Sequence, residues 1–462
     1  MSEQLIFDNC SHSRDPIVGC TLEGVANIIA GIKDISIVIH SPQGCAATVA
    51  LGFDNHEIDF TKRKVACTRL FETDIILGAG QKLKDLISQA DATFQTKFMF
   101  VVGTCSADII GEDMEGICRT MQPKVNARLI PVMAGGFRGN SYEGMNLGLK
   151  ALLPFIKKPE EVEQAPRSVN LIAPQASLNP TWRADLAWVA GVLQAMGVSV
   201  QAALTRETSM HQLRHASTAS ANILMSHDVG AAFMAKMTSD FGIPQLVPDL
   251  PLPVGLKNTA RWLTALGEHF GAQEVARQLI AEGEDGVVDI LRRRGLMIIP
   301  RYRNCRVAVS ADATIGTGLV RMLFEELEMI PELLLFRSDN PEARRILEAE
   351  LDDLGIKPKV AFGIDGYQIK KALSEHKVDA IFGSAWETYL AEELGIRIAF
   401  DVLSPTNRDV YLDRAYFGYE GMLNILEKIG NDWEVALRSK EIRWDQYDEA
   451  QRPDFVQSGA NP

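Results

Sequence analysis

Short apolar runs alternate along the whole chain with longer stretches in which apolar residues recur at helical spacing. The apolar runs predict buried strands at 35–40, 98–103, 129–134, 169–173, 198–203, 221–225, 306–310, 332–336, 359–362, 379–382 and 396–400. The longer stretches predict helices at 144–156, 185–196, 230–241, 259–270, 316–327, 342–354 and 387–394. This alternation predicts an α/β fold of mainly parallel sheets with helices on both faces.

Two polar stretches divide this pattern into three units. Residues 157–167 include Lys-Lys-Pro-Glu-Glu, and residues 292–304 are basic and end in Pro-Arg-Tyr-Arg-Asn. We therefore predict three Rossmann-like domains and a tail, at 1–165, 166–300, 301–430 and 431–462. The tail carries Trp433, Trp444 and Tyr447 in a charged background, which predicts a C-terminal arm on the surface.

Composition narrows the class of protein. The chain has 462 residues, 46% of them hydrophobic and 23% charged, which is an ordinary globular balance. Its net charge of −13 argues against a nucleic-acid partner, because phosphate binding needs a basic face. No apolar run reaches the length of a membrane span and no secretory signal is visible. We therefore expect a cytoplasmic protein whose seven cysteines are free or metal-bound.

Three cysteines in the first quarter of the chain have unusual settings. Cys45 and Cys105 each follow a predicted buried strand and precede a predicted helix, and Cys20 lies in Val-Gly-Cys-Thr. Thiols at strand ends point toward the rim of a sheet, where α/β proteins bind ligands. Nearby glycines allow a close backbone approach, which a large cluster needs. Three thiolates are one short of the four that an iron–sulfur cluster usually has, so we expect a cluster shared with another chain.

Ordinary packing is the alternative for every cysteine, because buried free cysteines are common. A zinc site is disfavoured, since no closely spaced Cys-x2-4-Cys pair occurs. The remaining cysteines are Cys10, Cys67, Cys118 and Cys305. We expect Cys118 and Cys305 to be packed in the core, whereas Cys67, after the basic run 62–64, is the best candidate for a spare ligand.

Other motifs favour no chemistry of their own. The run from Asp312 to Gly318 predicts a tight turn that leads into a helix, and it matches no nucleotide-binding fingerprint. No phosphate-binding Gly-x4-Gly-Lys-Ser/Thr motif occurs, so the chain is not expected to hydrolyse ATP. His211 and His215 have helical spacing in a polar stretch, which favours a solvated helix face. We assign no catalytic residue and no cofactor-binding residue beyond the cluster ligands.

Several segments resemble the nitrogenase component 1 family. They are His40-Ser-Pro-Gln-Gly-Cys45, Thr104-Cys-Ser-Ala-Asp-Ile-Ile-Gly-Glu-Asp113, Phe241-Gly-Ile-Pro244, the run 251–259, and Asp413-Arg414 with Phe417-Gly-Tyr-Glu-Gly421. The resemblance covers nearly the whole chain in order. It implies three Rossmann-like domains in an α2β2 assembly. It also implies an [8Fe-7S] P-cluster at the α–β interface with three cysteine ligands from each subunit, here Cys20, Cys45 and Cys105.

The resemblance also indicates which subunit this is. Catalytic D-type chains hold the active-site cofactor on a cysteine eighteen residues before the Gly-Ile-Pro proline, and that position is Ser226 here. The late cofactor histidine is missing as well, and the Gly-Tyr-Glu-Gly motif is similar to that of K-type chains. The resemblance therefore implies a beta (K-type) electron-relay subunit without a substrate site. Cofactor-assembly scaffolds are also similar, but they usually lack the third cysteine that Cys105 supplies.

Departures from the family pattern refine the expected substrate. Nitrogenase beta chains usually have a serine that can ligate the oxidised P-cluster, and matching on Phe137 puts Gly136 at that position. The family's Phe-Arg-Glu-Pro segment is replaced at 60–64, and the docking segment corresponds to Ile76, Leu77 and Gly78. These differences favour a nitrogenase-like reductase, with methylthio-alkane reductase, which cleaves C–S bonds, as the most similar family. A dinitrogen-reducing nitrogenase and a non-catalytic scaffold remain the alternatives.

The resemblance further implies how the subunit works with its partners. A separate iron protein hydrolyses ATP, docks transiently at the α–β face and delivers electrons to the P-cluster. The electrons then reach a cofactor in the D-type subunit. The chain is thus expected to be part of an oxidoreductase, with Ile76, Leu77 and Gly78 as a candidate docking patch.

Overall fold

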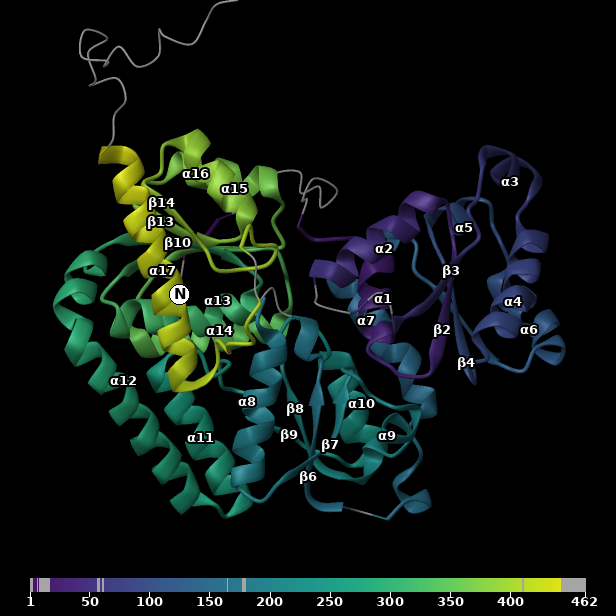
Figure 1. Ribbon diagram of the computed structural model, residues 1–462, viewed down its shortest axis with the longest axis horizontal. Coiled ribbons are helices and arrows are strands. Elements are labelled where there is room, and N and C mark those ends of the chain that lie inside the picture. The colour runs from purple at the N-terminus through teal and green to yellow at the C-terminus, as the bar shows by residue number, and fades with distance from the viewer. Residues whose placement is uncertain are drawn as a thin grey trace, which may run out of the picture.

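The computed structural model describes residues 3–5, 7, 17–55, 59, 62–163, 165–176, 180–408 and 411–441. Its strands form three sheets, of six, four and four strands, and every pairing between named strands of this described part is parallel. Helices cover the sheets, and the three sheets lie in separate parts of the molecule (Figure 1). The predicted α/β fold with mainly parallel sheets is therefore confirmed.

The first sheet has the strand order β3-β2-β4-β5. Its strands are β2 (Ile35–His40), β3 (Lys64–Cys67), β4 (Phe98–Gly103) and β5 (Arg128–Met133). Its helices are α1 (Thr21–Ala30), α2 (Gln43–Asn55), α3 (Glu72–Leu77), α4 (Gly80–Phe94), α5 (Cys105–Ile109), α6 (Met114–Met121) and α7 (Ser141–Leu152). Along β4, Phe100 and Val102 face the core with α1 and α7, whereas Met99 and Val101 face α4 and α6. Burial on both faces explains the unbroken apolar run of this strand.

The second sheet has the strand order β7-β6-β8-β9. Its strands are β6 (Ala165–Ile172), β7 (Ser199–Leu204), β8 (Ala219–Leu224) and β9 (Gln245–Leu246). The helices of this part of the chain are α8 (Trp182–Ala195), α9 (Met210–Arg214), α10 (Ala231–Phe241), α11 (Leu256–Phe270) and α12 (Gln273–Tyr302). Buried residues of α8 and α11 share one hydrophobic core with strands of the third sheet, so the second and third units are packed together.

The third sheet has the strand order β1-β12-β11-β10-β13-β14. Its strands are β1 (Glu3–Gln4), β10 (Arg306–Ala311), β11 (Ile330–Phe336), β12 (Lys359–Phe362), β13 (Ala380–Gly383) and β14 (Ile398–Asp401). Its helices are α13 (Ala313–Arg321), α14 (Pro341–Leu354), α15 (Gly366–Glu375), α16 (Ala385–Leu394) and α17 (Gly418–Glu441). The N-terminal strand β1 joins this sheet beside β12 and not the first sheet.

All the predicted strands and helices are present, with small shifts at their ends. Three strands were not predicted, namely β1, β3 and β9. The stretch 292–304, predicted to be a polar joint, is helical up to Tyr302, where α12 ends. The surface position predicted for Trp433 is wrong, since its side chain is buried and its ring lies 5.6 Å from the ring of Tyr302. Trp444 and Tyr447 lie outside the described residues, and the domain boundaries stay predictions.

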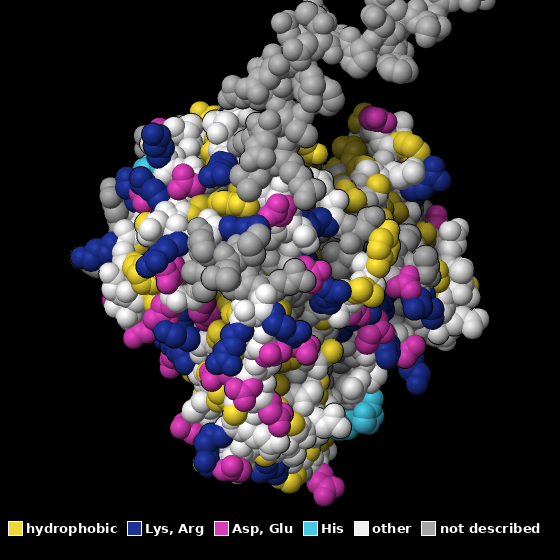
Figure 2. All heavy atoms as spheres, turned by 60° about the vertical axis from the view of Figure 1, so that its left-hand side comes forward, with side chains coloured by type: hydrophobic (Ala, Val, Ile, Leu, Met, Phe, Trp, Pro, Cys, Tyr) yellow, Lys and Arg dark blue, Asp and Glu magenta, His cyan; other side chains and the backbone are white. Residues whose placement is uncertain are grey.

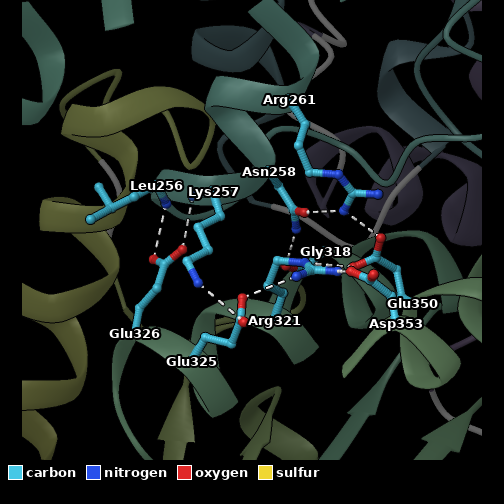
Figure 3. Close-up of polar contacts among 10 residues, drawn as sticks. All are labelled: Leu256, Lys257, Asn258, Arg261, Gly318, Arg321, Glu325, Glu326, Glu350 and Asp353. Carbon is cyan, nitrogen blue, oxygen red and sulfur yellow. Dashed lines mark hydrogen bonds and ion pairs between the residues drawn. The ribbon is translucent and has the colours of Figure 1, made fainter. Parts of the chain in front are cut away.

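A network of charged side chains joins α11 to α13 and α14 (Figure 3). The buried Arg321 donates from Nε to Glu350 at 2.8 Å, and Glu350 also pairs with Arg261 of α11. Glu326 accepts hydrogen bonds from the backbone N–H groups of Leu256 and Lys257, at 2.9 and 3.0 Å. Those donors belong to the first turn of α11, which has no earlier carbonyl to bond to. The network therefore caps α11 and fixes it to the third unit.

A second polar contact lies where β8 ends against the first turn of α13. The Thr314 hydroxyl donates to the Asp228 carboxylate at 2.6 Å and accepts from the backbone N–H of His227 at 2.8 Å. Ser226 lies 3.3 Å from the same hydroxyl. Ser226, His227 and Asp228 are almost fully buried. Buried polar groups are stable only when they are hydrogen-bonded, so this contact ties the second unit to the third.

The surface carries charges of both signs. On the face in Figure 2, Lys and Arg side chains are interspersed with Asp and Glu side chains and form no continuous basic field. Among the helices that the structure describes, none is both long enough and apolar enough to span a membrane.

Protonation of His227 should control stability in weak acid. Burial lowers the pKa of His227 from 6.5 to about 4, so the unfolded chain binds this proton first as the pH falls. The stabilisation is therefore complete above about pH 6.5 and declines toward pH 4, by roughly 3 kcal/mol, because one pKa unit corresponds to about 1.4 kcal/mol. Urea unfolding of the His227→Gln variant should show a weaker loss of stability across this window.

The exposed His211 provides the matched control, because its ring lies on the surface of α9. The His211→Gln variant should lose stability with falling pH as the unaltered chain does. An unchanged pH dependence in His227→Gln would contradict the assignment of this acid sensitivity to His227.

Candidate functional site

The carboxyl ends of the first sheet bring the singled-out cysteines to one edge. Cys67 is the last residue of β3, Cys45 lies in the first turn of α2 after β2, and Cys105 begins α5 directly after β4. Because the strands are parallel and in the order β3-β2-β4-β5, these segments lie at the same edge. Cys20 is the N-cap residue of α1, and an isolated antiparallel β-bridge to Asn140 holds it at this edge. Side chains far apart in sequence are thereby collected in one place.

Gly136, which follows β5, closes the site on the side of Cys105. Its backbone N–H donates to the Cys105 sulfur at 3.2 Å. A Cβ atom built on Gly136 would lie 3.3 Å from that sulfur and 3.6 Å from the Cβ of Cys20. Cys20 and Cys105 therefore flank one point, and any side chain at position 136 would project between them.

The electrostatics of Cys45 show that four thiols share this edge. Burial raises the pKa of the Cys45 thiol, and the neighbouring charges of Cys105, Cys20 and Cys67 raise it further. All four side chains are half-buried, whereas Cys118 and Cys305 are buried in hydrophobic cores. The prediction that Cys118 and Cys305 are core residues is confirmed. Cys10 lies outside the described residues.

This donor set is suited to iron and sulfide. Thiolates are soft ligands, and bound iron would neutralise the mutual repulsion that opposes their ionisation. Cys20, Cys45 and Cys105 also lie at or beside helix N-termini, which favour negative charge. No group of three or more His, Cys, Asp or Glu side chains in the described ranges is arranged to hold one metal ion. The fit to iron and sulfide therefore rests on the chemistry of the thiols and on their shared sheet edge.

The segment Thr104–Asp113 is built to hold this edge. The Thr104 hydroxyl donates to the carbonyl of His40 at 2.9 Å, which joins the ends of β4 and β2. Asp108 pairs with Arg138 at 3.0 Å and so fixes the loop that contains Gly136. Asp113 caps α6 by accepting from the backbone N–H of Gly116 at 2.8 Å. The polar residues of this motif position the loops around Cys105.

The loop between β2 and Cys45 is held by a buried polar network. The Thr68 hydroxyl accepts from the backbone N–H of Ser41 at 3.0 Å and lies 3.2 Å from Nδ1 of His40. On its other side, the His40 ring lies 3.7 Å from the Glu112 carboxylate. Burial is the main reason that the pKa of His40 is lowered. These contacts fix the chain direction just before Cys45.

Protein atoms lie against two of the three glycines beside the cysteines. A Cβ atom on Gly19 would overlap the carboxylate of Glu23, and one on Gly103 would lie 2.8 Å from the Met133 sulfur. A Cβ atom on Gly44 would have no atom within 4 Å, so of these three glycines it alone faces open space. Protein atoms therefore explain why positions 19 and 103 are occupied by glycine. The Glu23 carboxylate beside Gly19 is itself partly buried, and this burial raises the pKa of Glu23 to about 7.

The short strand β3, which ends at Cys67, was not predicted from the sequence. The signal for it was the short apolar run Val65-Ala-Cys67 directly after the basic residues 62–64. Register then places Cys67 beside Ile39 of β2, one strand away from the segment that carries Cys45.

The other candidate residues lie away from the thiols. Asp312 caps α13 directly after β10, so the predicted strand-to-helix turn is confirmed. His211 and His215 stack at 4.1 Å between ring centres on α9, which agrees with a solvated helix face. Ser226 is buried in the hydrogen-bonded contact with Thr314 described above.

The residues predicted to form a docking patch are on the surface. Ile76 and Leu77 end α3 with side chains that are 80% and 84% exposed, and Gly78 follows with a φ of +90°. Near the same edge, Phe137 is 76% exposed and Ile109 is 67% exposed. Large apolar side chains this exposed favour an interaction surface.

A cavity of about 650 Å³ lies elsewhere, between α8, α12 and α17. It is lined by aromatic residues such as Trp188 and by charges of both signs, including Arg183 and Glu420, but by no cysteine. This lining lacks a convergent set of reactive groups. We therefore take as the candidate site the sheet edge that carries Cys20, Cys45, Cys67 and Cys105, which we call the thiol edge.

The chain is similar to known proteins in sequence and in fold. The chain is 26% identical over 413 residues to a nitrogenase iron-molybdenum cofactor biosynthesis protein NifE of Methanococcus maripaludis, covering 88% of this chain and 81% of that protein. It is 24% identical over 468 residues to a nitrogenase molybdenum-iron protein beta chain of Methanococcus maripaludis, covering 90% and 93%. A solved structure titled "Nitrogenase Cp1 at pH 6.5" has the same fold, with a TM-score of 0.76 and 17% identity over 98% of both chains.

The family described as nitrogenase component 1 type oxidoreductase matches residues 20–434. The match begins at Cys20 and includes Cys45, Cys67 and Cys105, together with the three sheets from β2 onward. The chain therefore belongs to the nitrogenase component 1 type oxidoreductase family.

Proposed function

We propose that this chain is the beta (K-type) electron-relay subunit of a nitrogenase-like reductase in the cytoplasm. Cys20, Cys45 and Cys105 would be its ligands to an [8Fe-7S] P-cluster shared with a D-type subunit in an α2β2 assembly. The observation that carries the proposal is the position of these thiols at one sheet edge, where the charges of Cys105 and Cys20 contribute to raising the pKa of Cys45. When bound, the cluster supplies one-electron redox chemistry.

The chain's own groups would tune that chemistry. A backbone N–H donated to a ligating sulfur stabilises the thiolate's negative charge, and Gly136 provides such a donor to Cys105 at 3.2 Å. Gly136 has no side chain, so it offers no oxygen ligand between Cys20 and Cys105. The sulfur ligands of this chain would therefore act without the serine that other beta chains usually provide.

The proposal assigns the substrate site to the partner. At Ser226, the position of the cofactor cysteine in D-type chains, a buried hydroxyl bonds with Thr314 and accepts from the backbone N–H of Asp228 at 3.2 Å. This hydroxyl is occupied within the fold and is a poor metal ligand compared with a thiolate. The chain would thus deliver electrons and leave substrate binding to the D-type subunit.

Docking of the ATP-dependent iron protein would use Ile76, Leu77 and Gly78. Two largely exposed aliphatic side chains at the end of α3 fit the apolar centre of a transient interface. Phe137 and Ile109, nearer the thiols, would instead be covered by the D-type subunit that completes the cluster.

For the reaction, we propose reductive C–S cleavage by a methylthio-alkane reductase. The departures at Gly136 and at the docking segment support this choice over dinitrogen reduction. A second candidate is a non-catalytic scaffold that assembles a cofactor, and the relative named as a cofactor biosynthesis protein, at 26% identity, favours it. A scaffold would release its cluster to an acceptor and turn over no substrate.

Loss of one ligand should remove the metal. In the Cys105→Ala variant, co-purified anaerobically with the partner, we expect the cluster iron to be lost and the assembly to be weakened. Iron analysis and size-exclusion chromatography measure both effects. The Cys118→Ala variant is the matched control, because Cys118 is a buried thiol of α6 outside the site. Full iron content in Cys105→Ala would contradict the ligand assignment.

Changes in the docking patch should slow electron delivery without removing iron. A charge introduced by Leu77→Asp would have to be desolvated at the interface, so we expect about a tenfold or greater loss in iron-protein-dependent turnover. The iron content should stay unchanged. Val435→Asp on α17, where the original side chain is 68% exposed, is the control and should retain the full rate. Equal rates for both variants would exclude this patch.

The substrate is tested with the complete system. The purified complex, its iron protein and ATP should convert 2-(methylthio)ethanol to ethylene and methanethiol, measured by gas chromatography. Ammonia formed from dinitrogen would instead identify a nitrogenase. No turnover of either compound, together with transfer of iron to an acceptor protein, would identify a scaffold.

A further inference from the structure

Four strand ends define the thiol edge, and the outermost one provides a cysteine that the proposed function does not use. Cys67 ends β3, which pairs with β2 in parallel so that Ile39 lies opposite Cys67. The next segments along the sheet carry Cys45, Cys105 and Gly136. Three of the four strand ends therefore provide a sulfur, and Cys20 adds a fourth from α1.

The Cys67 thiol is held against the loop that leads to Cys45. It donates to the carbonyl of Ser41 at 3.4 Å, and its sulfur accepts from the backbone N–H of Arg69 at 3.4 Å. These contacts fix the position of the sulfur beside residues 41 and 42, which precede the helix that carries Cys45. The side chain is half-buried, so it is accessible to an incoming ligand, unlike the core thiols of Cys118 and Cys305.

Cys67 also lies at the same sheet edge as the other three cysteines. It is one strand away from the segment that carries Cys45, and Cys20 and Cys105 flank Gly136 farther along this edge. These four thiols are not arranged to hold one metal ion, in the part of the chain that the structure describes. A cubane cluster needs four sulfur ligands that are spread around a larger body than one ion.

We propose that Cys20, Cys45, Cys67 and Cys105 form a complete four-thiolate set, so that this chain by itself can hold a [4Fe-4S] cluster before its partner joins. The inference rests on the proposed function for three of the ligands and adds Cys67 as the fourth. The shortfall of one ligand that indicates sharing with a partner would then apply only to the assembled complex.

The binding step is a ligand exchange without change of oxidation state. Each cysteine thiol replaces one small thiolate on a preformed [4Fe-4S] cluster. One iron–sulfur bond forms for each that breaks, and the displaced thiolate leaves with the cysteine's proton. No oxidant or reductant is needed.

The test uses the full chain, expressed without its partner and kept anaerobic. It is mixed with a synthetic [4Fe-4S] cluster that carries small thiolates, and then desalted. We expect about four irons per chain, and about three or fewer in Cys67→Ala, with a changed electron paramagnetic resonance spectrum. Alkylation followed by mass spectrometry should show Cys67 protected only in the loaded chain. Cys118→Ala is the control and should load four irons.

A purely structural role for Cys67 is separated by Cys67→Ser, which keeps a donor for the Ser41 carbonyl but removes the sulfur. An unchanged iron count and spectrum in Cys67→Ser, or alkylation of Cys67 in the loaded chain, would overturn the inference. Circular dichroism checks that each variant is folded. If a variant is unfolded alone, the same measurements are made on the complex with a partner whose own cluster cysteines are replaced by alanine.

Failure of the inference and failure of the proposed function give different results. If Cys20→Ala, Cys45→Ala and Cys105→Ala lose iron while Cys67→Ala does not, only the fourth ligand is wrong. If none of the four variants loses iron, the cluster site itself is wrong.

Discussion

The parallel pairing of the first sheet is the constraint on which the site depends. Parallel strands present their carboxyl ends at one edge, so residues more than thirty positions apart, such as Cys67 and Cys105, are brought together without any local motif. A shift of one residue in register would turn each strand's side chains to the opposite face. The alternating burial of Met99, Phe100, Val101 and Val102 against two layers of helices prevents such a shift.

The same convergence gathers several half-buried thiols at one edge. Burial, together with the charges of the other thiols, raises the pKa of Cys45. Iron relieves that repulsion, since it replaces protons with positive charge. Nearby, Phe137 and Ile109 expose apolar surface that a partner would cover. Cluster binding and subunit assembly would therefore stabilise one another at this edge.

The second and third units are joined in a different way. Their contact is a set of hydrogen bonds in which Ser226, His227 and Asp228 meet Thr314, and a charged network in which Glu350 bridges Arg261 and Arg321 (Figure 3). Most of these polar groups bond to one another, whereas Nδ1 of His227 and Oδ1 of Asp228 are buried without a hydrogen-bond partner among the described residues. In the proposed function, the first unit would carry the redox chemistry and the other two would act as a rigid support.

The sequence determined much of the framework. Buried parallel strands must be apolar on both faces, so each strand with a long apolar run was predictable, and so were Cys45 and Cys105 at the ends of two of them. The prediction failed where local sequence was overruled by packing. The glycines of α12 disfavour a helix, yet Gly283 is needed because the Tyr419 ring lies against it. Trp433 is followed by a charged tail, yet it packs on Tyr302.

The site shows the same division between sequence and structure. The spacing of Cys20, Cys45 and Cys105, together with the family motifs, indicated a cluster. Thiols at strand ends can be recognised in the linear sequence, because they follow apolar runs. The place of Cys67 could not be read in the same way, since β3 is a short edge strand whose pairing with β2 is a long-range contact. Only the tertiary structure put Cys67 at the same sheet edge as the other cysteines, because strand order is decided by packing between distant segments and not by the residues that flank each cysteine.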